Sequence, residues 1–316
     1  MEKKAFKRIS SALLVVGVFW VLTSYMPRFL WDFSFDNVIE SELISSLLSF
    51  ISSIVMYTVA TLIIYLFLRK LPTLKEEPKK KMKLSEFLGW ACSMRGVAMV
   101  LSLVGVLLFI ILVLAIRGPS SIMELLTKSN PLLQLDSFDM VMNLVLISVV
   151  APIMEEIMFR RLFLDALRPF GDLVAILYSG LAFGLLHMNV QQITYACGLG
   201  IMLGYVMTKT NNLLCCIGLH ATLNASTAVL LPLLENVSDL DNIAKLLPIG
   251  CAIGLLIVVS IIGLVLFFMH LKHIRIEKPR FRFIAPINAK LVILNIGTIP
   301  YILLCLAVSI VVIIKL

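Results

Sequence analysis

Long apolar runs separated by short polar stretches occupy almost the whole chain. A membrane-spanning helix needs about 20 predominantly apolar residues. By that measure nine segments are candidate spans: Ile9–Met26, Leu43–Leu68, Gly96–Ile116, Phe138–Phe163, Leu173–Met188, Ile193–Met207, Leu213–Leu233, Leu247–Leu271 and Leu291–Ile314. The pattern therefore predicts an all-α fold, a polytopic membrane helix bundle with about eight or nine transmembrane helices.

The first candidate span resembles the start of a signal peptide, because four basic residues between Lys3 and Arg8 precede its apolar run. A cleaved signal peptide ends in a small-x-small pattern. The residues from Ser24 to Pro27 read Ser-Tyr-Met-Pro and lack that pattern. We therefore expect a retained signal anchor.

The composition agrees with a membrane protein and excludes an ordinary water-soluble globule. Hydrophobic residues make up 60% of the chain and charged residues 15%, and the mean hydropathy is +1.02. Soluble domains average about 45–50% apolar and about 25% charged residues. The formal charge of 27 − 19 = +8 would suggest a nucleic-acid partner in a soluble protein. Here the positive charge is concentrated in alternate loops between the spans, so we expect no nucleic-acid partner.

Basic and acidic loops alternate along the chain, and this alternation predicts the orientation. Lys and Arg gather at 3–8, 69–83, 160–168 and 272–290, whereas the intervening loops at 32–42, 124–136 and 235–241 carry mainly Asp and Glu. Cytoplasmic loops carry the basic excess. The sequence therefore predicts a cytoplasmic N-terminus and, with nine spans, a C-terminus on the other side. The run Lys79–Lys81 could also bind anionic lipid, but the basic excess of cytoplasmic loops is sufficient to account for it.

The same pattern suggests three regions. Residues 1–137 form N-terminal transmembrane helices, residues 138–233 form a core that holds the unusual polar residues, and residues 234–316 form C-terminal transmembrane helices. The last two spans follow a Pro- and Arg-rich connection around Arg280 and look like an appended pair.

A few ionisable groups lie deep within the predicted spans, where such groups are costly and are functional candidates by default. With a rise of 1.5 Å per residue, Glu155, His187 and Asn224 lie about 20–22 Å from one membrane boundary, and His220 lies about 14 Å from it. Residues from three helices thus meet in one slab of the membrane. A proton relay would instead spread over successive depths, so we expect a single reaction centre in a polar intramembrane cavity.

Spacing assigns different tasks to the acidic pair. Glu156 and Arg160 are four residues apart and can form an ion pair on one helix face. That pair alone could be a structural device that holds helices together. Glu155 points about 100° away from it and is available as a base or ligand. Pro152, just before the acids, weakens the helical ladder and can kink it. The glycines at positions 198, 200 and 204 indicate close helix packing.

These residues resemble the three motifs of the CPBP family, the CAAX-processing and bacteriocin-processing intramembrane proteases. Glu-Glu-x-x-x-Arg stands at Glu155–Arg160, Phe-x-x-x-His at Phe183–His187, and His-x-x-x-Asn at His220–Asn224. The resemblance covers residues 138–233 and implies an intramembrane endopeptidase. One departure is Arg161, because many relatives have Gly after the motif Arg; a second cation there can alter packing or approach the carboxylates.

The resemblance also implies roles for the motif residues. Glu155 would be the general base that activates water together with His187, and His220 and Asn224 would stabilise the oxyanion. A rival mechanism makes Glu155, His187 and His220 the ligands of a catalytic zinc, since two His and one carboxylate are a recognised zinc set. We favour the metal-free mechanism without a cofactor; zinc stays open.

The expected partners are a peptide or membrane-anchored protein substrate and the lipid bilayer. The substrate's identity, including whether it is prenylated, does not follow from the sequence. The short basic N-terminus fits a multi-pass protein of a bacterial plasma membrane, and an endoplasmic reticulum membrane is also compatible. Two other functions remain open, a non-enzymatic transporter-like or scaffold protein and an inactive relative that acts as an immunity partner.

Overall fold

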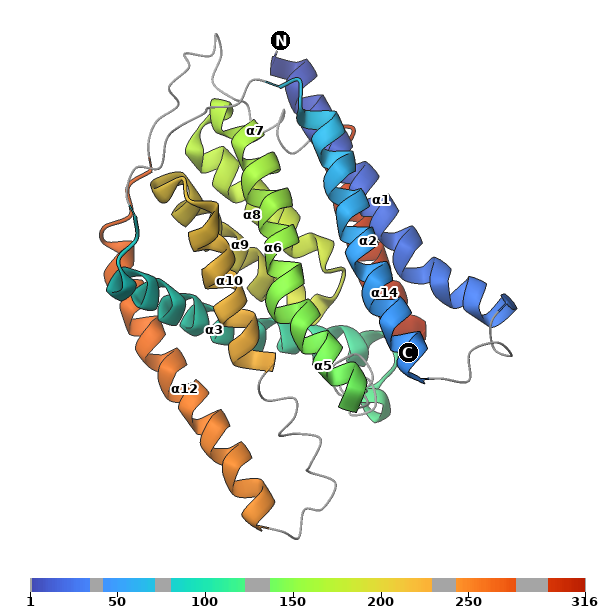
Figure 1. Ribbon diagram of the computed structural model, residues 1–316, viewed down its shortest axis with the longest axis vertical. Helices are drawn as coiled ribbons and strands as arrows, with labels where there is room; N and C mark the ends of the chain where they lie inside the picture. The colour runs from blue at the N-terminus through green and yellow to red at the C-terminus, as the bar shows by residue number, and fades with distance from the viewer. Residues whose placement is uncertain are drawn as a thin grey trace.

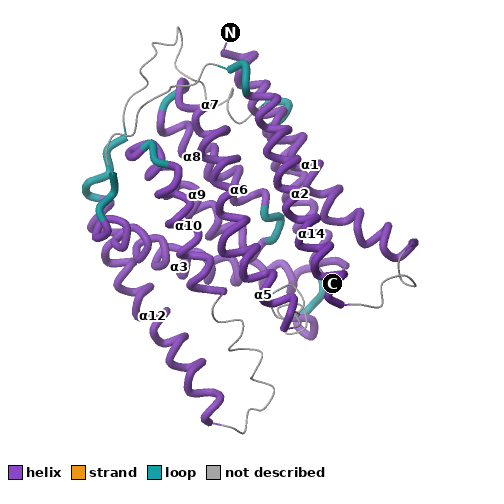
Figure 2. Tube along the Cα trace, viewed as in Figure 1, coloured by secondary structure: helices purple, strands orange, loops and turns teal. Residues whose placement is uncertain are grey.

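The computed structural model describes residues 2–34, 42–71, 81–122, 137–228, 243–276 and 295–315. These residues form helices joined by short turns, with no strand among them, as Figure 2 shows. The α-helices are α1 (Glu2–Ser34), α2 (Glu42–Leu68), α3 (Leu84–Ile116), α5 (Ser137–Val145), α6 (Ala151–Glu156), α7 (Asp165–Leu167), α8 (Asp172–Leu186), α9 (Val190–Thr210), α10 (Leu213–Ala228), α12 (Ile243–Leu271) and α14 (Thr298–Lys315). Two π-helical segments, η3 (Leu146–Val150) and η4 (Ile157–Leu164), and two short 3₁₀ helices, η1 (Pro119–Ser121) and η5 (Arg168–Phe170), complete the list.

The predicted helix bundle is confirmed, and the count of eight or nine spans is approximate. Within the described ranges, seven helices are long and apolar enough to cross a membrane. Two further apolar helices, α8 and α10, contain only 15 and 16 residues. The third helix begins at Leu84, twelve residues before the predicted start at Gly96, and the fourth continues without a break from Met140 to Phe170. Both helices are longer than the hydropathy alone suggested.

Glycines let the central helices α8 and α9 pack closely. A Cβ at Gly180 would lie 2.6 Å from the backbone nitrogen of Ile201, and one at Gly184 would lie 2.5 Å from that of Cys197. On α9, a Cβ at Gly200 would lie 2.7 Å from the carbonyl oxygen of Gly180. Only glycine fits such contacts, because real Cβ atoms essentially never come within 3.0 Å of a neighbouring atom, and small residues let membrane helices approach this closely. This packing fixes α8, which carries part of the candidate site.

Asparagines form the turns at both ends of α9. At its start, the Asn189 side chain accepts a hydrogen bond from the backbone N–H of Gln191 at 2.9 Å. At its end, Asn211 is left-handed with a φ of +49°, and the Asn212 side chain caps α10 by accepting from the N–H of Leu214. Asn tolerates both the left-handed conformation and the N-cap position. The two turns return the chain sharply, so α8, α9 and α10 are neighbours.

Helices α1 and α14 lie side by side and run in the same direction, as Figure 1 shows. Gly297 meets Ser10 and, further along, Gly17 meets the ring of Tyr301. The two labelled chain ends consequently lie at opposite ends of the bundle (Figure 1). Which end faces the cytoplasm stays a prediction. Most of the loops on which this orientation prediction depends, including Lys79 and Lys80, lie outside the described residues.

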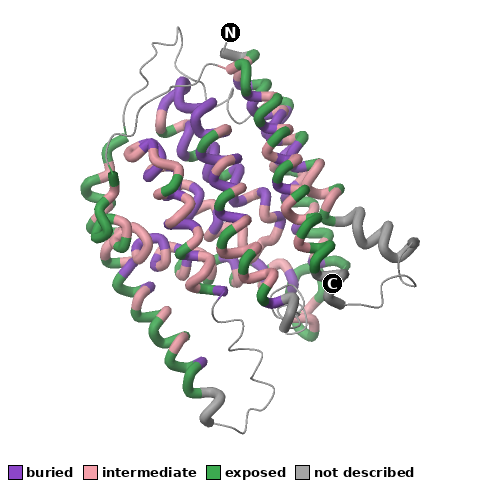
Figure 3. Tube along the Cα trace, in the orientation of Figure 1, coloured by how far each residue is buried: buried purple, intermediate pink, exposed green. Residues whose placement is uncertain are grey.

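The last two spans do not form an appended pair. Helix α12 packs along α3, where Gly96 and Gly263 allow close contact, whereas α14 packs on α1 and α8. The buried Tyr301 of α14 donates a hydrogen bond to the backbone carbonyl of Ala182 in α8 at 2.7 Å. Figure 3 shows the buried residues concentrated in the central helices, while α12 is exposed along much of its length.

Candidate active site

A cavity of about 550 Å³ lies among α2, α3, α9, α10 and the helix that contains η3 and α6. It brings together four candidates: Glu155 from α6, His187 from the end of α8, and His220 and Asn224 from α10. The polar side chains in its wall are Tyr57, Arg95, Ser102, Glu155, His187, Gln192, Tyr195, His220, Asn224 and Thr227. The four candidates expected to converge from counting residues along three helices therefore line one cavity, whose wall also contains many apolar side chains.

Two π-helical segments flank the acidic motif, η3 before it and η4 after it. At the end of η3 the N–H of Ala151 bonds to the carbonyl of Leu146, five residues earlier. The next bond in this register would join residue 152 to the carbonyl of Ile147, but Pro152 has no N–H. The Asn224 side chain supplies the missing donor at 2.9 Å. Single π turns often mark functional sites. Here the carbonyl that the π turn leaves without a backbone donor accepts from Asn224 and so links α10 to the acidic helix.

Glu155 is held by a residue that the motifs do not contain. The hydroxyl of Tyr57, on α2, donates a hydrogen bond to Glu155 Oε1 at 2.8 Å. The other carboxylate oxygen, Oε2, lies 3.7 Å from His220 Nε2. Glu155 is therefore not free on both sides, because one oxygen is fixed by Tyr57 and the other remains for chemistry.

Glu156 lies behind the cavity and contacts Arg160 and His220. Its Oε2 lies 3.0 Å from Arg160 Nε, and its Oε1 lies 3.0 Å from His220 Nδ1. Glu156 and Arg160 are both completely buried. An ionised carboxylate only accepts hydrogen bonds, so His220 Nδ1 carries the hydrogen in this contact. Glu156 thus anchors Arg160 and orients the ring of His220.

His187 lies where α8 ends, and its tautomer follows from its surroundings. Its Nδ1 lies 3.1 Å from the carbonyl oxygen of Phe183, and a carbonyl only accepts, so Nδ1 carries the hydrogen. In the neutral ring Nε2 then holds the lone pair. The next residue, Met188, has a φ of +50°, a strained conformation for a residue other than glycine. The strained turn keeps His187 at the cavity.

The ring of Phe183 lies against Arg160 and both histidines of the cavity. Its centroid lies 5.1 Å from that of His187 and 5.6 Å from that of His220, both edge to face. The guanidinium of Arg160 lies 4.9 Å from the same centroid, a favourable cation–π distance. Phe183 therefore separates Arg160 from the cavity and orients both histidines.

Two arginines differ from what the sequence suggested. Arg161 does not approach the carboxylates of the motif; its side chain is 53% exposed and pairs with Asp165 at 3.2 Å. The predicted third span starts at Gly96 and therefore does not include Arg95. Since α3 begins at Leu84, Arg95 lies eleven residues inside a helix and lines the cavity. A longer hydropathy window would have exposed this intramembrane cation.

The rival zinc set fits the side chains poorly as they are placed. Among the described residues, no three His, Cys, Asp or Glu side chains are grouped closely enough to hold a metal ion. Glu155 already accepts from Tyr57, and Nδ1 of His220 faces Glu156. Metal dependence stays a prediction to be tested.

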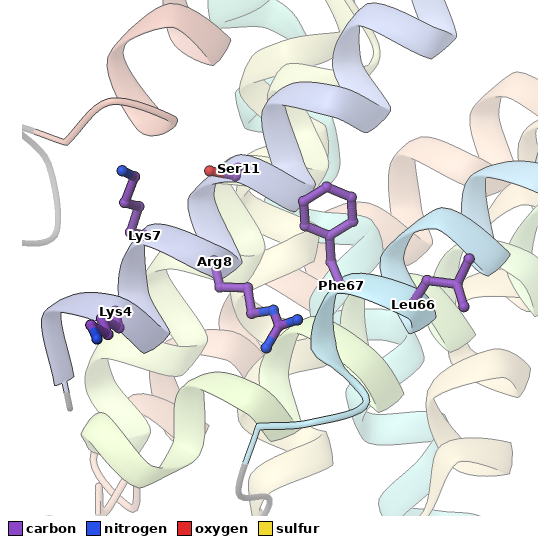
Figure 4. Close-up of a pocket in the computed structure, with 6 residues that line it drawn as sticks. All are labelled: Lys4, Lys7, Arg8, Ser11, Leu66 and Phe67. Atoms are coloured by element: carbon purple, nitrogen blue, oxygen red, sulfur yellow. The ribbon is translucent and has the colours of Figure 1, made fainter.

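Two other hollows have different characters. A cavity of about 200 Å³ lies on the α1 side of Glu155 and His187, and Trp20 helps to line it. A separate basic pocket of about 470 Å³ lies between the start of α1 and the end of α2. Figure 4 shows Arg8 of α1 extending toward α2 near Phe67. This pocket contains none of the candidate residues and belongs to the basic end of the bundle.

In a comparison with protein families, one family matches the continuous segment that contains the acidic helix, α8, α9 and most of α10. Residues 137–226 match the family described as type II CAAX prenyl endopeptidase Rce1-like. No curated protein and no solved structure matched the chain. All three motifs fall within the matched segment, which is similar to the Rce1-like family, and at family level this match supports an intramembrane CAAX-type protease.

Proposed function

We propose that the Rce1-like domain at residues 137–226 makes this chain an intramembrane endopeptidase in which Glu155 and His187 activate water without a metal. The observation that carries the proposal is that both side chains line the same two cavities. A water between them donates one hydrogen to Glu155 Oε2 and the other to His187 Nε2. Its oxygen lone pair then faces the substrate carbonyl.

Glu155 takes the proton as water attacks the peptide carbonyl, and the proton later passes to the leaving amine. A positioned general base contributes about 10²–10⁴-fold to such a step. The hydrogen bond from Tyr57 keeps one carboxylate oxygen in place, so that only Oε2 receives the proton. Tyr57 is thus a positioning residue.

His220 and Asn224 would stabilise the oxyanion of the tetrahedral intermediate. Nδ1 of His220 already donates to Glu156, so His220 presents an N–H at Nε2 only as an imidazolium. The Asn224 amide uses one N–H for the carbonyl of Ile147 and keeps a second. Donors fixed in advance in a water-poor cavity are effective at such a site.

The short helix α8 supports a reaction inside the membrane. Its 15 residues span about 22 Å, less than the roughly 30 Å of a hydrocarbon core. If α8 begins at one membrane boundary, the turn at His187 lies within the membrane. Irregular backbone at that depth occurs where it lines a cavity, as it does here.

The test compares Glu155→Gln with Arg161→Gln on a prenylated peptide that ends in a CAAX motif. Purified in mild detergent, Glu155→Gln should fold normally and lose at least about 100-fold in kcat, because only the proton acceptor is removed. Arg161→Gln changes a charge at an exposed side chain outside both cavities and should cleave at the wild-type rate. Turnover by Glu155→Gln above a tenth of wild type would show that another group is the base.

A further inference from the structure

The basic pocket between α1 and α2 has a volume of about 470 Å³ and shares no lining residue with the two cavities of the candidate site. Its lining consists of Lys4, Lys7, Arg8 and Ser11 of α1 and of Leu66 and Phe67 of α2. In Figure 4 the side chain of Arg8 reaches across the pocket toward Phe67. Ligand sites usually have volumes of about 300–1,000 Å³, so the pocket has room for a small polar group.

The start of α1 is a fixed platform for the three cations. Lys7 and Arg8 lie three and four residues after Lys4, so all three side chains share one face of the helix. On the opposite side, Phe6 is completely buried, and its ring lies 5.3 Å from that of Phe170 and 5.4 Å from that of Tyr178. These ring contacts hold the first turns of α1 against the helices of the core and leave the cations exposed.

The charges of the pocket are unbalanced. Among the described residues its lining contains three cations and no acidic side chain. Like charges one turn apart on a helix repel each other. The arginines of the acidic helix differ, because Arg160 contacts Glu156 and Arg161 contacts Asp165. An anion that enters the pocket would offset the repulsion among the three cations, and their exposure leaves them accessible to it.

The pocket also lies where two candidate membrane spans have their ends. The span Lys4–Ser24 begins at the pocket, and the span Leu47–Leu68 ends there. Arg8 is four residues inside the first span, or about 6 Å along the helix. Phospholipid headgroups lie at such a boundary, just outside the hydrocarbon core, and long basic side chains extend toward them.

We propose that this pocket binds the phosphate group of an anionic phospholipid from the adjoining leaflet. The guanidinium of Arg8 offers parallel N–H donors that match two phosphate oxygens, and Lys4 and Lys7 add two point charges. The apolar side chains of Leu66 and Phe67 border the same pocket, so the first carbons of an acyl chain pack against them. This apolar border favours a lipid over a free phosphate ion, which would use only the polar side.

The first experiment measures lipid binding to the purified full chain and does not depend on proteolysis. Native mass spectrometry in mild detergent compares phosphatidylglycerol with phosphatidylcholine of the same acyl chains. Phosphatidylcholine should bind at least about fivefold more weakly, because its headgroup has no net charge. Each basic residue near an anionic lipid contributes about fivefold to binding. The variant Lys4→Gln/Arg8→Gln should therefore bind phosphatidylglycerol about 25-fold more weakly and phosphatidylcholine almost unchanged.

The matched control is Arg69→Gln/Lys70→Gln. It also removes two exposed positive charges, directly after α2 ends at Leu68, but neither residue lines the pocket. It should weaken phosphatidylglycerol less than about twofold, because surface charges away from the headgroup are screened. An equal loss in the two double variants would show general attraction to a basic surface and would overturn the proposal, as would equal binding of the two lipids to the parent protein.

The variant Arg8→Lys decides if Lys4→Gln/Arg8→Gln does not fold. It keeps the basic N-terminal end that orients a membrane protein and loses one of the parallel hydrogen bonds to phosphate. Binding of phosphatidylglycerol should fall about fivefold, the usual net effect of one hydrogen bond. Unchanged binding would contradict the role given to Arg8.

Inorganic phosphate tests the soluble source of the same chemistry. As a competitor it should displace phosphatidylglycerol only at concentrations at least about 100-fold above that of the lipid, because it gains nothing from burying apolar surface. Phe67→Ala should weaken the lipid and leave inorganic phosphate unchanged. If inorganic phosphate binds as tightly as the lipid and loses affinity in Lys4→Gln/Arg8→Gln, the pocket is a site for a soluble phosphate and the lipid assignment is wrong.

Discussion

Removing the charge of Glu156 should destabilise the fold through Arg160, not through Glu156 itself. Both side chains are fully buried, and Glu156 contacts Arg160 and His220 at 3.0 Å each. In Glu156→Gln the guanidinium keeps the ring of Phe183 at 4.9 Å but loses its carboxylate. Breaking a buried ion pair from one side costs about 3–5 kcal/mol.

The double variant Glu156→Gln/Arg160→Met should therefore be more stable than Glu156→Gln alone. Replacing a buried pair by uncharged side chains is often nearly neutral, and we expect a coupling of at least about 2 kcal/mol between the two positions. Reversible unfolding in mixed micelles measures all four corners of the cycle. Arg161→Met, at a half-exposed side chain, should change the stability by less than about 1 kcal/mol.

The reasoning fails if the two single variants add to within about 0.5 kcal/mol. That result would mean that Arg160 finds another counter-charge or water when Glu156 is neutral. A loss of cleavage activity without a loss of stability in Glu156→Gln would also contradict it, because Glu156 would then act through the orientation of His220 and not through the stability of the fold.

Two further changes test the packing and the metal question. Gly184→Ala should lower the free energy of unfolding by about 1–3 kcal/mol and reduce cleavage, because the new Cβ meets the backbone of Cys197 one turn before His187. The control Gly254→Ala has nothing within 4 Å of its new Cβ and should change neither stability nor cleavage. Equal melting temperatures of the two variants would refute the close packing. A strong chelator should leave cleavage unchanged, and the His220→Gln variant should keep residual activity because its amide can still donate to the oxyanion. One zinc per wild-type chain, together with an inactive and metal-free His220→Gln variant, would favour the metal mechanism.

The sequence predicted the helical bundle and the meeting of polar residues because both depend on regular spacing. Apolar runs of the right length indicate spans, and 1.5 Å per residue places Glu155, His187 and Asn224 at one depth. The calculation needed no knowledge of how the helices pack. The side chains do line one cavity, whereas their depth in the membrane stays a prediction.

The residues that the sequence did not predict are those that depend on contacts between distant segments. Tyr57 reaches Glu155 across 98 positions and Arg95 reaches Thr227 across 132, and no local spacing encodes either pair. Arg95 could have been found as a cation inside a span, but the predicted third span starts at Gly96 and so does not include it. The link from Asn224 to Ile147 follows from a π turn at Pro152, which periodicity arguments do not anticipate.

The hydrogen bond from Tyr301 to Ala182 has a consequence for the order of assembly in the cell. Residues 137–226 leave the ribosome well before residues 298–315, yet α8 lies against α14 and α1. Until Tyr301 is synthesised, the carbonyl of Ala182, one turn before Leu186 and His187, has no side-chain donor, and the surface that α14 will cover faces lipid or the insertion machinery. The nascent chain thus contains every motif residue before the scaffold around them is closed, and the helix that carries Tyr301 is the last to complete the surroundings of α8.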